Sequence, residues 1–141
     1  EGNREAALES FRLFGEAAGD AMATAVTLTD SLIVIGGGLT GAARYIMPSL
    51  MKVLRSTIHT INGEQLQRVQ MNVFDLDSEH EFEEFAHGNA REIQVYGTDK
   101  TVTYDPMKRT GVMISKLGAS KAISIGAYTY ALSQLDLAGD E

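Results

Sequence analysis

Apolar residues recur every three or four positions over the first thirty residues of the chain. From residue 5 to about residue 29 this spacing predicts an amphipathic helix, because such positions share one helix face. Gly15 and Gly19 lie one turn apart on it. Glycine within a helix costs up to about 1 kcal/mol relative to alanine, so we expect close backbone approach to another element. The apolar stripe, which we expect to pack along a sheet, consists of Leu8, Phe11, Phe14, Ala18, Ala21, Met22 and Ala25.

A short, almost entirely apolar run follows at residues 31–35. It lies between Asp30 and three glycines, a pattern that predicts a buried strand covered on both faces. The apolar spacing of residues 46–61 then predicts a second amphipathic helix ending at residues 62–63. We expect Pro48 in its first turn, where the missing N–H of proline is tolerated.

The next segment alternates apolar and polar residues and then turns acidic. Alternation over residues 68–74 predicts a half-buried strand nearer a sheet edge. Ser78 and Glu81 have the spacing of a capping box, and Gly88 is a typical helix stop, so we expect a helix over residues 79–87.

The last third of the chain has the pattern of a hairpin, a strand and a helix. Residues 93–96 and 101–104 flank a loop of hairpin length. Residues 111–115 predict a last strand, residues 120–135 a last helix, and residues 136–141 a frayed tail.

This order of helices and strands predicts an α/β fold. The alternation favours a mostly parallel or mixed sheet flanked by helices, within a single domain of residues 1–141. We find no internal repeat.

Composition narrows the class of protein. The chain is 44% hydrophobic and 22% charged, which is typical of globular proteins. It has no cysteine, which excludes disulfides, thiolate zinc sites and a cysteine nucleophile. Its net charge of -7 makes nucleic acid an improbable partner. We find no apolar stretch long enough to span a membrane, and the first residues do not resemble a signal peptide, so we expect none. We therefore expect a cytoplasmic protein.

Three glycines at the end of the predicted strand are the most informative local feature. A backbone without Cβ atoms at Gly36, Gly37 and Gly38 can lie against a flat or charged group, and the following helix start favours anions. With Leu39 and Thr40, this turn is our candidate nucleotide site. The alternative is that the glycines serve only a tight turn between strand and helix.

A dinucleotide fingerprint is also formally present. Gly36, Gly38 and Gly41 satisfy G-x-G-x-x-G, but the acidic residue expected roughly 20 residues later is missing. The first candidates, Asp75 and Asp77, follow Gly41 by more than thirty residues. We therefore do not favour NAD.

Histidine and acidic residues raise two weaker alternatives. His80 and His87, with Glu83 and Glu84 between them, could face a metal, but seven residues are two helical turns, so we expect no metal site. Asp75 and Asp77 could be a carboxylate pair or simply a turn facing solvent. We interpret His59 as an exposed helix residue.

The order of these features resembles a known family. The run from Leu32 to Gly38, then a helix containing proline, and finally residues 116–120 leading into Gly126, Ala127 and Tyr128 resemble the C-terminal end of the ROK family. That family comprises glucokinase-like sugar kinases and sugar-responsive repressors. The resemblance implies an actin-like, hexokinase-like ATPase fold built on ribonuclease-H-like halves.

The resemblance also implies roles for individual residues. Gly36, Gly37 and Gly38 match the glycines whose backbone would lie against the adenosine of ATP, with Leu39 and Thr40 beside it. Gly126 and Ala127 match a pair of small residues that lets the final helix of the family pack tightly near the nucleotide cleft. No catalytic or metal-ligating residue is implied here. ATP, Mg²⁺ and a hexose would be partners of the full-length protein, and a homo-oligomer is expected.

Several family motifs are absent from this chain. It lacks the Asp-x-Gly-x-Thr phosphate loop, the Asp base and the zinc motif, and residues 91–110 are longer than the connection expected. We therefore expect a processed or excised fragment, the ATP-binding C-terminal part of a sugar kinase that acts when joined to its N-terminal lobe. The alternatives are the corresponding lobe of a repressor or a dimerisation lobe without a catalytic role.

Overall fold

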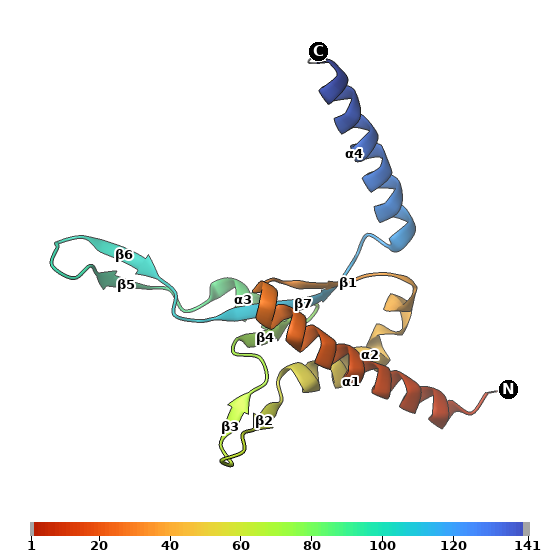
Figure 1. Cartoon of the computed structure of the whole chain (residues 1–141), viewed down its shortest axis with the longest axis horizontal. Coiled ribbons are helices and arrows are strands. Elements are labelled where there is room, and N and C mark those ends of the chain that lie inside the picture. Colours follow the sequence, from red (N-terminus) through yellow and green to blue (C-terminus); the bar gives the residue numbers. More distant parts are fainter. Residues whose placement is uncertain (1, 140–141) are drawn as a thin grey trace.

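Helices and strands alternate along residues 2–139, the part of the chain that this computed structural model describes (Figure 1). In chain order they are α1 (Arg4–Thr29), β1 (Ile33–Ile35), the 3-10 helix η1 (Gly38–Ala42), α2 (Ala43–Leu54), β2 (Thr57–His59), β3 (Gln65–Gln67), β4 (Asn72–Asp75), α3 (Glu79–His87), β5 (Arg91–Gln94), β6 (Thr101–Tyr104), β7 (Arg109–Ile114) and α4 (Ala119–Gly139).

A three-stranded parallel sheet of order β1-β7-β4 lies at the centre. On one side of β7, Val112 is paired with Ile33, and on the other side Thr110 is paired with Val73. The antiparallel pairs, β2 with β3 and β5 with β6, form separate hairpins. The sequence therefore predicted an α/β arrangement correctly, while the antiparallel strands stand apart from the parallel sheet.

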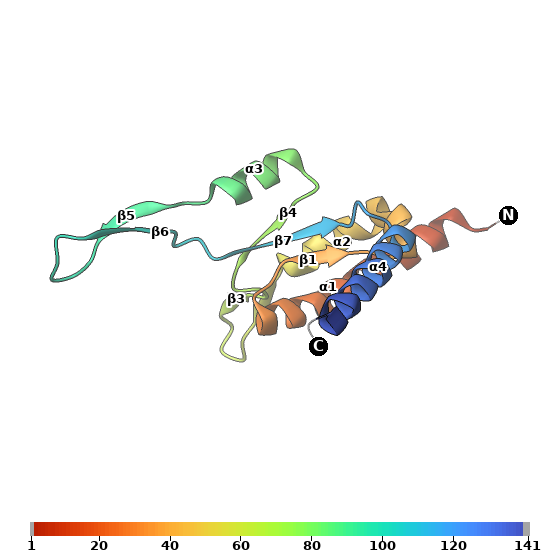
Figure 2. The ribbon, with the colours of Figure 1, turned by 90° about the horizontal axis from the view of Figure 1, so that it is seen from above.

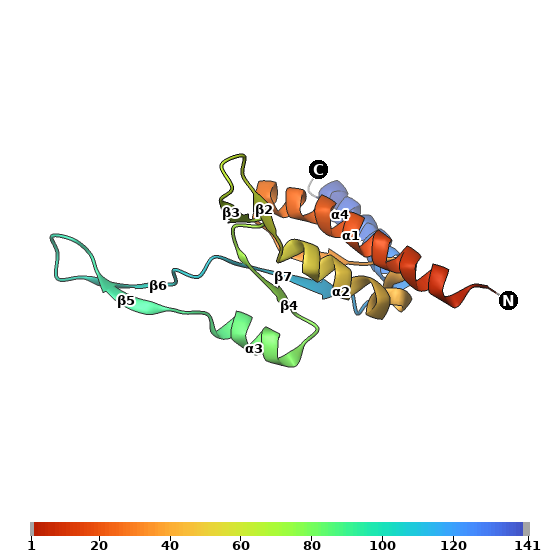
Figure 3. The ribbon, with the colours of Figure 1, turned by 90° about the horizontal axis from the view of Figure 1, so that it is seen from below.

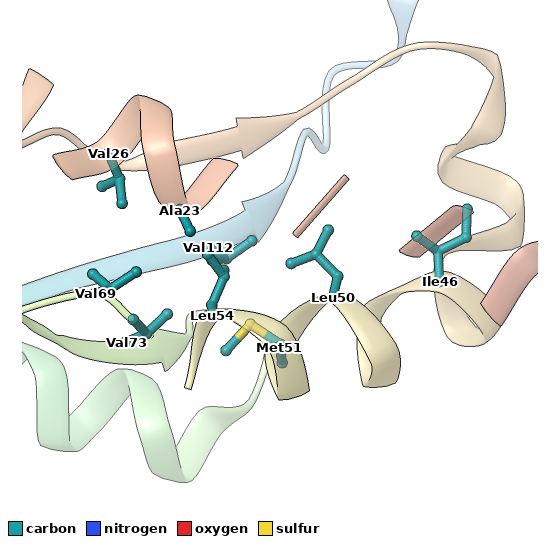
Figure 4. Packing of buried hydrophobic residues seen from close by; sticks show 9 residues of the cluster. All are labelled: Ala23, Val26, Ile46, Leu50, Met51, Leu54, Val69, Val73 and Val112. Carbon is teal, nitrogen blue, oxygen red and sulfur yellow. The ribbon is translucent and has the colours of Figure 1, made fainter. Parts of the chain in front are cut away.

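The hydrophobic core lies between one face of this sheet and the helices α1 and α2 (Figure 4). Burying apolar side chains provides the main stabilisation of such a fold, at roughly 25 cal/mol per Å². On the opposite face, α3 covers β4, where the rings of Phe74 and Phe85 meet edge to face at 5.8 Å. The core residues are Ala23, Val26, Ile46, Leu50, Met51, Leu54, Val69, Val73 and Val112.

The predicted first helix is confirmed, and its two internal glycines explain how it packs. α1 lies along α2, and only its last turns reach the sheet through Ala23 and Val26. A Cβ added at Gly19 would lie 2.9 Å from the carbonyl oxygen of Leu50 in α2. The glycines thus allow two helix backbones to approach each other closely, as the sequence predicted.

The expectation that β1 is covered on both faces is wrong for the described residues. β1 is an edge strand, and only Ile33 and Ile35 turn toward the core. Val34 points to the other face and is 59% exposed. The apolar run at residues 31–35 predicted burial, but no described element covers this end of the second face.

The second helix is shorter than predicted. α2 begins at Ala43, so Pro48 lies in its second turn rather than its first. It ends at Leu54, and the apolar residues that seemed to continue it belong to the β2-β3 hairpin. Residues 62–63 form the hairpin turn, with φ +83° at Gly63. His59 is accordingly a strand residue, not the helix residue we expected.

The short acidic helix is confirmed from its first to its last residue, but it is not capped as predicted. Ser78 makes no side-chain cap. Glu81 instead accepts a hydrogen bond of 2.7 Å from the backbone N–H of Asp75 and pairs with Arg55. β4 lies at a sheet edge as expected, although it starts at Asn72 rather than residue 68.

Two elements project from the body of the molecule. The predicted hairpin β5-β6 extends to one side in all three views (Figures 1, 2 and 3), and α4 extends away from the sheet in Figure 1. The side chains of α4 are exposed as far as Leu135. α4 has helical backbone to Gly139, and residues 140–141 of the expected frayed tail lie outside the described residues.

Candidate functional site

The glycine turn lies at the carboxyl ends of the parallel strands. Ser115, directly after β7, donates its N–H to the carbonyl oxygen of Ile35 at 2.8 Å. Asp77 accepts a hydrogen bond of 2.7 Å from the N–H of Ile114. The first contact holds the ends of β1 and β7 side by side, and the second holds the segment after β4 to the end of β7. Ligands of open α/β sheets bind at this edge.

Within the turn, Gly37 and Gly38 differ in how far the backbone requires glycine. Gly37 has φ +99°, a conformation that other residues rarely adopt. Gly38 has no such backbone constraint. A Cβ added there would also meet nothing within 4 Å among the described residues. Thr40 donates its hydroxyl to the carbonyl oxygen of Gly37 at 2.9 Å, which holds the turn in shape. Gly37 is therefore required by the backbone, whereas Gly38 leaves open space.

An apolar cavity of about 240 Å³ lies beside this turn, between α1, α2 and the strand ends. Gly36, Leu39 and Thr40 belong to its wall, so the predicted turn and the cavity form one site. Its volume is below the roughly 300–1,000 Å³ of pockets for drug-sized ligands, so it would hold only part of a nucleotide. The remaining lining residues are Phe14, Ala18, Met22, Ile35, Ala43, Ile46, Met47, Leu50 and Ile114.

None of the side chains lining this cavity titrates, so they offer binding surface rather than acid or base chemistry. The sequence did not predict that residues of α1 would line this cavity. Phe14, Ala18 and Met22 fitted the apolar stripe of a packing helix, and nothing in the sequence indicated that they would face the turn. The stripe itself was the available signal, but only the packing of α1 on α2 brings it there.

The structure does not bring the second predicted pair to this site. Gly126 and Ala127 lie on α4, which projects from the body (Figure 1). A Cβ added at Gly126 would meet nothing within 4 Å among the described residues. The tight packing expected of this pair therefore has no partner in this part of the chain, and it stays a prediction.

The weaker alternatives have structural explanations. Within residues 2–139, no group of three or more His, Asp or Glu side chains could hold a metal ion. Asp75 accepts the N–H of Asp77 at 3.1 Å, and Asp77 in turn holds the end of β7, so both carboxylates serve the local fold.

Within residues 2–139, no helix has the length and apolar character to cross a membrane.

A second hollow, of about 580 Å³, lies between α2, β4 and α3 and was not predicted. Its lining includes Arg55, His80, Glu81 and Glu84. Arg55 pairs with Glu81 and also donates to the carbonyl oxygen of Val73 at 2.9 Å. These two groups thus connect three elements of the fold, and we assign the hollow no ligand.

Comparison with known proteins supports a specific class for this fold. No family model matches the chain, and no curated protein matches it. Among solved structures, the chain is similar to the glucokinase from Parabacteroides distasonis ATCC 8503, with a TM-score of 0.78 and 51% sequence identity over 94% of this chain. The chain is thus similar in both fold and sequence to part of a glucokinase.

The likeness covers only a portion of the larger protein. The matched region is 35% of the glucokinase chain, so this chain spans about a third of its length. We therefore extend the activity of the whole glucokinase to this chain only as a proposal.

Proposed function

We propose that this chain is the C-terminal, nucleotide-binding part of a ROK-type sugar kinase. Joined to an N-terminal lobe, it would phosphorylate a hexose with Mg-ATP. The observation that carries the proposal is 51% identity to a glucokinase over nearly the whole chain. The open glycine turn at the carboxyl ends of two parallel strands supports it, because nucleotides bind at such edges.

The shape of the turn fits an adenosine group. Gly37 and Gly38 expose backbone with open space beside it, so a flat base can approach without meeting a side chain. Leu39 is half exposed and, with the apolar wall of the cavity, offers a surface for a ring. Thr40 positions Gly37 through its hydroxyl. In this proposal Gly36, Gly37, Gly38, Leu39 and Thr40 orient the nucleotide.

The chemical step would depend on groups supplied from elsewhere. Phosphoryl transfer to a sugar needs a carboxylate to accept the hydroxyl proton and cationic groups around the transferred phosphoryl. Mg²⁺ bound to the ATP phosphates would neutralise developing charge. Mg²⁺ is commonly held by substrate phosphates and one or two carboxylates, so a dedicated metal cage in this chain is not required.

Activity of the intact protein tests the proposal. We expect glucose-dependent formation of ADP from Mg-ATP, measured with a coupled assay, and none when the sugar is omitted. The alternatives predict that ATP is not consumed: a repressor lobe would bind sugar without turnover, and a dimerisation lobe would bind neither. ATP consumption that does not depend on any hexose would contradict the kinase assignment.

A further inference from the structure

The cavity beside the glycine turn has an apolar wall where α1 and α2 face each other. The side chains that these two helices contribute to the lining are hydrocarbon, except for the sulfurs of Met22 and Met47. A thioether sulfur is only a weak hydrogen-bond acceptor. A polar group that entered between the helices would therefore meet no strong hydrogen-bonding side chain among the described residues.

The polar groups of the lining lie at the turn instead. Thr40 has the one hydroxyl among the described lining residues, and it belongs to η1 rather than to the wall between the helices. It donates this hydroxyl to the carbonyl oxygen of Gly37 at 2.9 Å, and the same oxygen accepts the N–H of Thr40 at 3.3 Å. The cavity thus has a polar side at the turn and an apolar side between α1 and α2.

The cavity has room for one edge of a purine base. Its volume is about 240 Å³, and an apolar cavity of about 150 Å³ in another protein binds benzene. A purine has two fused rings, and its ribose and phosphates extend further. Only one side of the base can therefore enter, while the rest lies along the turn.

The chemistry of the apolar wall decides which edge of the base suits it. Adenine carries an amino group at carbon 6 but only hydrogen at carbon 2, whereas guanine carries an amino group at carbon 2. Burying a polar group without a partner costs free energy. The carbon 2 edge of adenine therefore fits this wall, and the amino group of guanine at the same position would be buried there without an acceptor.

We propose that the wall between α1 and α2 receives the carbon 2 edge of the purine and so selects nucleotides with hydrogen at that carbon over those with an amino group. The proposal rests on the proposed function, because it concerns how the same site distinguishes its nucleotides. Recognition through the amino group at carbon 6 would instead need an acceptor in this wall, and the described residues provide only the two sulfurs.

Binding of four nucleoside triphosphates to the intact protein tests the proposal. ATP and 2-aminoadenosine triphosphate differ only by the amino group at carbon 2, and so do inosine and guanosine triphosphate. A buried donor left without a partner weakens binding by roughly tenfold to a hundredfold. We therefore expect the dissociation constant, measured by isothermal titration with Mg²⁺, to rise at least tenfold with the amino group in both pairs.

Two neighbouring alanines of α1 test the cavity itself. Ala18 lines it, whereas Ala17 is exposed. Ala18→Leu puts a larger side chain into the space and should raise the dissociation constant for ATP at least tenfold, while Ala17→Leu should leave it unchanged. The melting temperatures of both variants show whether the fold is kept, and the series of nucleotides on the wild-type protein needs no substitution.

The possible results separate this proposal from the proposed function. Equal binding within either pair of nucleotides would overturn the proposal, as would a folded Ala18→Leu variant that binds ATP as tightly as Ala17→Leu does. In both cases ATP still binds, so the proposed function stands. A wild-type protein that does not bind ATP would instead contradict the proposed function, and this selectivity would be lost with it.

Discussion

Gly15 of α1 lies directly against Ile46 of α2. A Cβ added at Gly15 would lie 2.5 Å from the carbonyl oxygen of Ile46, well inside van der Waals contact. The Cβ would also meet the side chain of Ser49, but the carbonyl of Ile46 is helix backbone and cannot move aside at low cost. This contact sets how closely the two helices approach, and both helices also contribute to the wall of the cavity beside the glycine turn.

Gly15→Ala should therefore destabilise the protein although alanine favours helix. Overpacking a tight contact costs about 1–3 kcal/mol, which exceeds the gain in helix propensity of up to about 1 kcal/mol. The free energy of unfolding from urea titration measures the difference. Ala17→Gly, on the exposed side of the same helix, provides the reference and should cost no more than about 1 kcal/mol. A stabilised Gly15→Ala variant would show that the helices are not in contact there.

The core between α2 and the sheet should depend on Leu50. Its side chain is 1% exposed, and truncation leaves a cavity, so Leu50→Ala should lower the free energy of unfolding by about 2–5 kcal/mol. Leu28→Ala is the matched control, because Leu28 is 81% exposed and surface changes usually stay within about 0.5 kcal/mol. Similar losses for both leucines would be incompatible with this core.

The base of the β5-β6 hairpin should loosen in acid. Asp105 accepts N–H groups from Met107 at 2.8 Å and Asn89 at 3.3 Å and pairs with Arg109, which joins the two ends of the hairpin. Hydrogen bonding by Met107, assisted by Arg109, lowers the pKa of Asp105 below its ordinary value. Because the folded-state pKa of Asp105 is lowered, the stabilisation is fully present above the ordinary pKa of Asp, about 3.9. It is lost as pH falls through the folded-state pKa.

Hydrogen exchange of the hairpin measures this effect. Below about pH 4, protection of the β5 and β6 amides should fall relative to that of α1, after correction for the intrinsic exchange rate. Asp105→Asn cannot ionise, so its hairpin should show weak protection at every pH. A hairpin whose corrected protection is the same at pH 3 and pH 7 in the wild-type protein would argue against this role for Asp105.

Elements whose patterns were locally unambiguous were predicted well from the sequence. The acidic helix α3 and the helix α1 have their expected bounds within a residue or two. Residues 57–67 were misread because Ile58 and Ile61 fit a helical period as well as a strand. Tertiary contacts decide between the two: Arg55 donates to the carbonyl oxygen of Val73, and the N–H of Arg68 donates to that of Ser56 at 2.9 Å.

The candidate site, too, was predicted only in part from the sequence. The glycine turn could be predicted, because three glycines between a strand and a helix are a local signal. The cavity beside it could not, because Phe14 and Met22 reach it only through the packing of α1 on α2. Likewise, the exposure of Val34 depends on which elements cover the sheet, which residues 31–35 alone cannot specify.

The central claim, that the glycine turn binds the nucleotide, is tested most directly at Gly38. This residue has no left-handed φ and open space around it, so Gly38→Val puts bulk at the proposed adenosine surface without backbone strain, unlike a change at Gly37. Gly2→Val, at an equally open glycine outside the turn, is the control. In the intact protein we predict that Gly38→Val raises the KM for ATP at least tenfold and leaves the KM for the sugar unchanged, while Gly2→Val alters neither. A Gly38→Val enzyme with the wild-type KM for ATP would contradict the account.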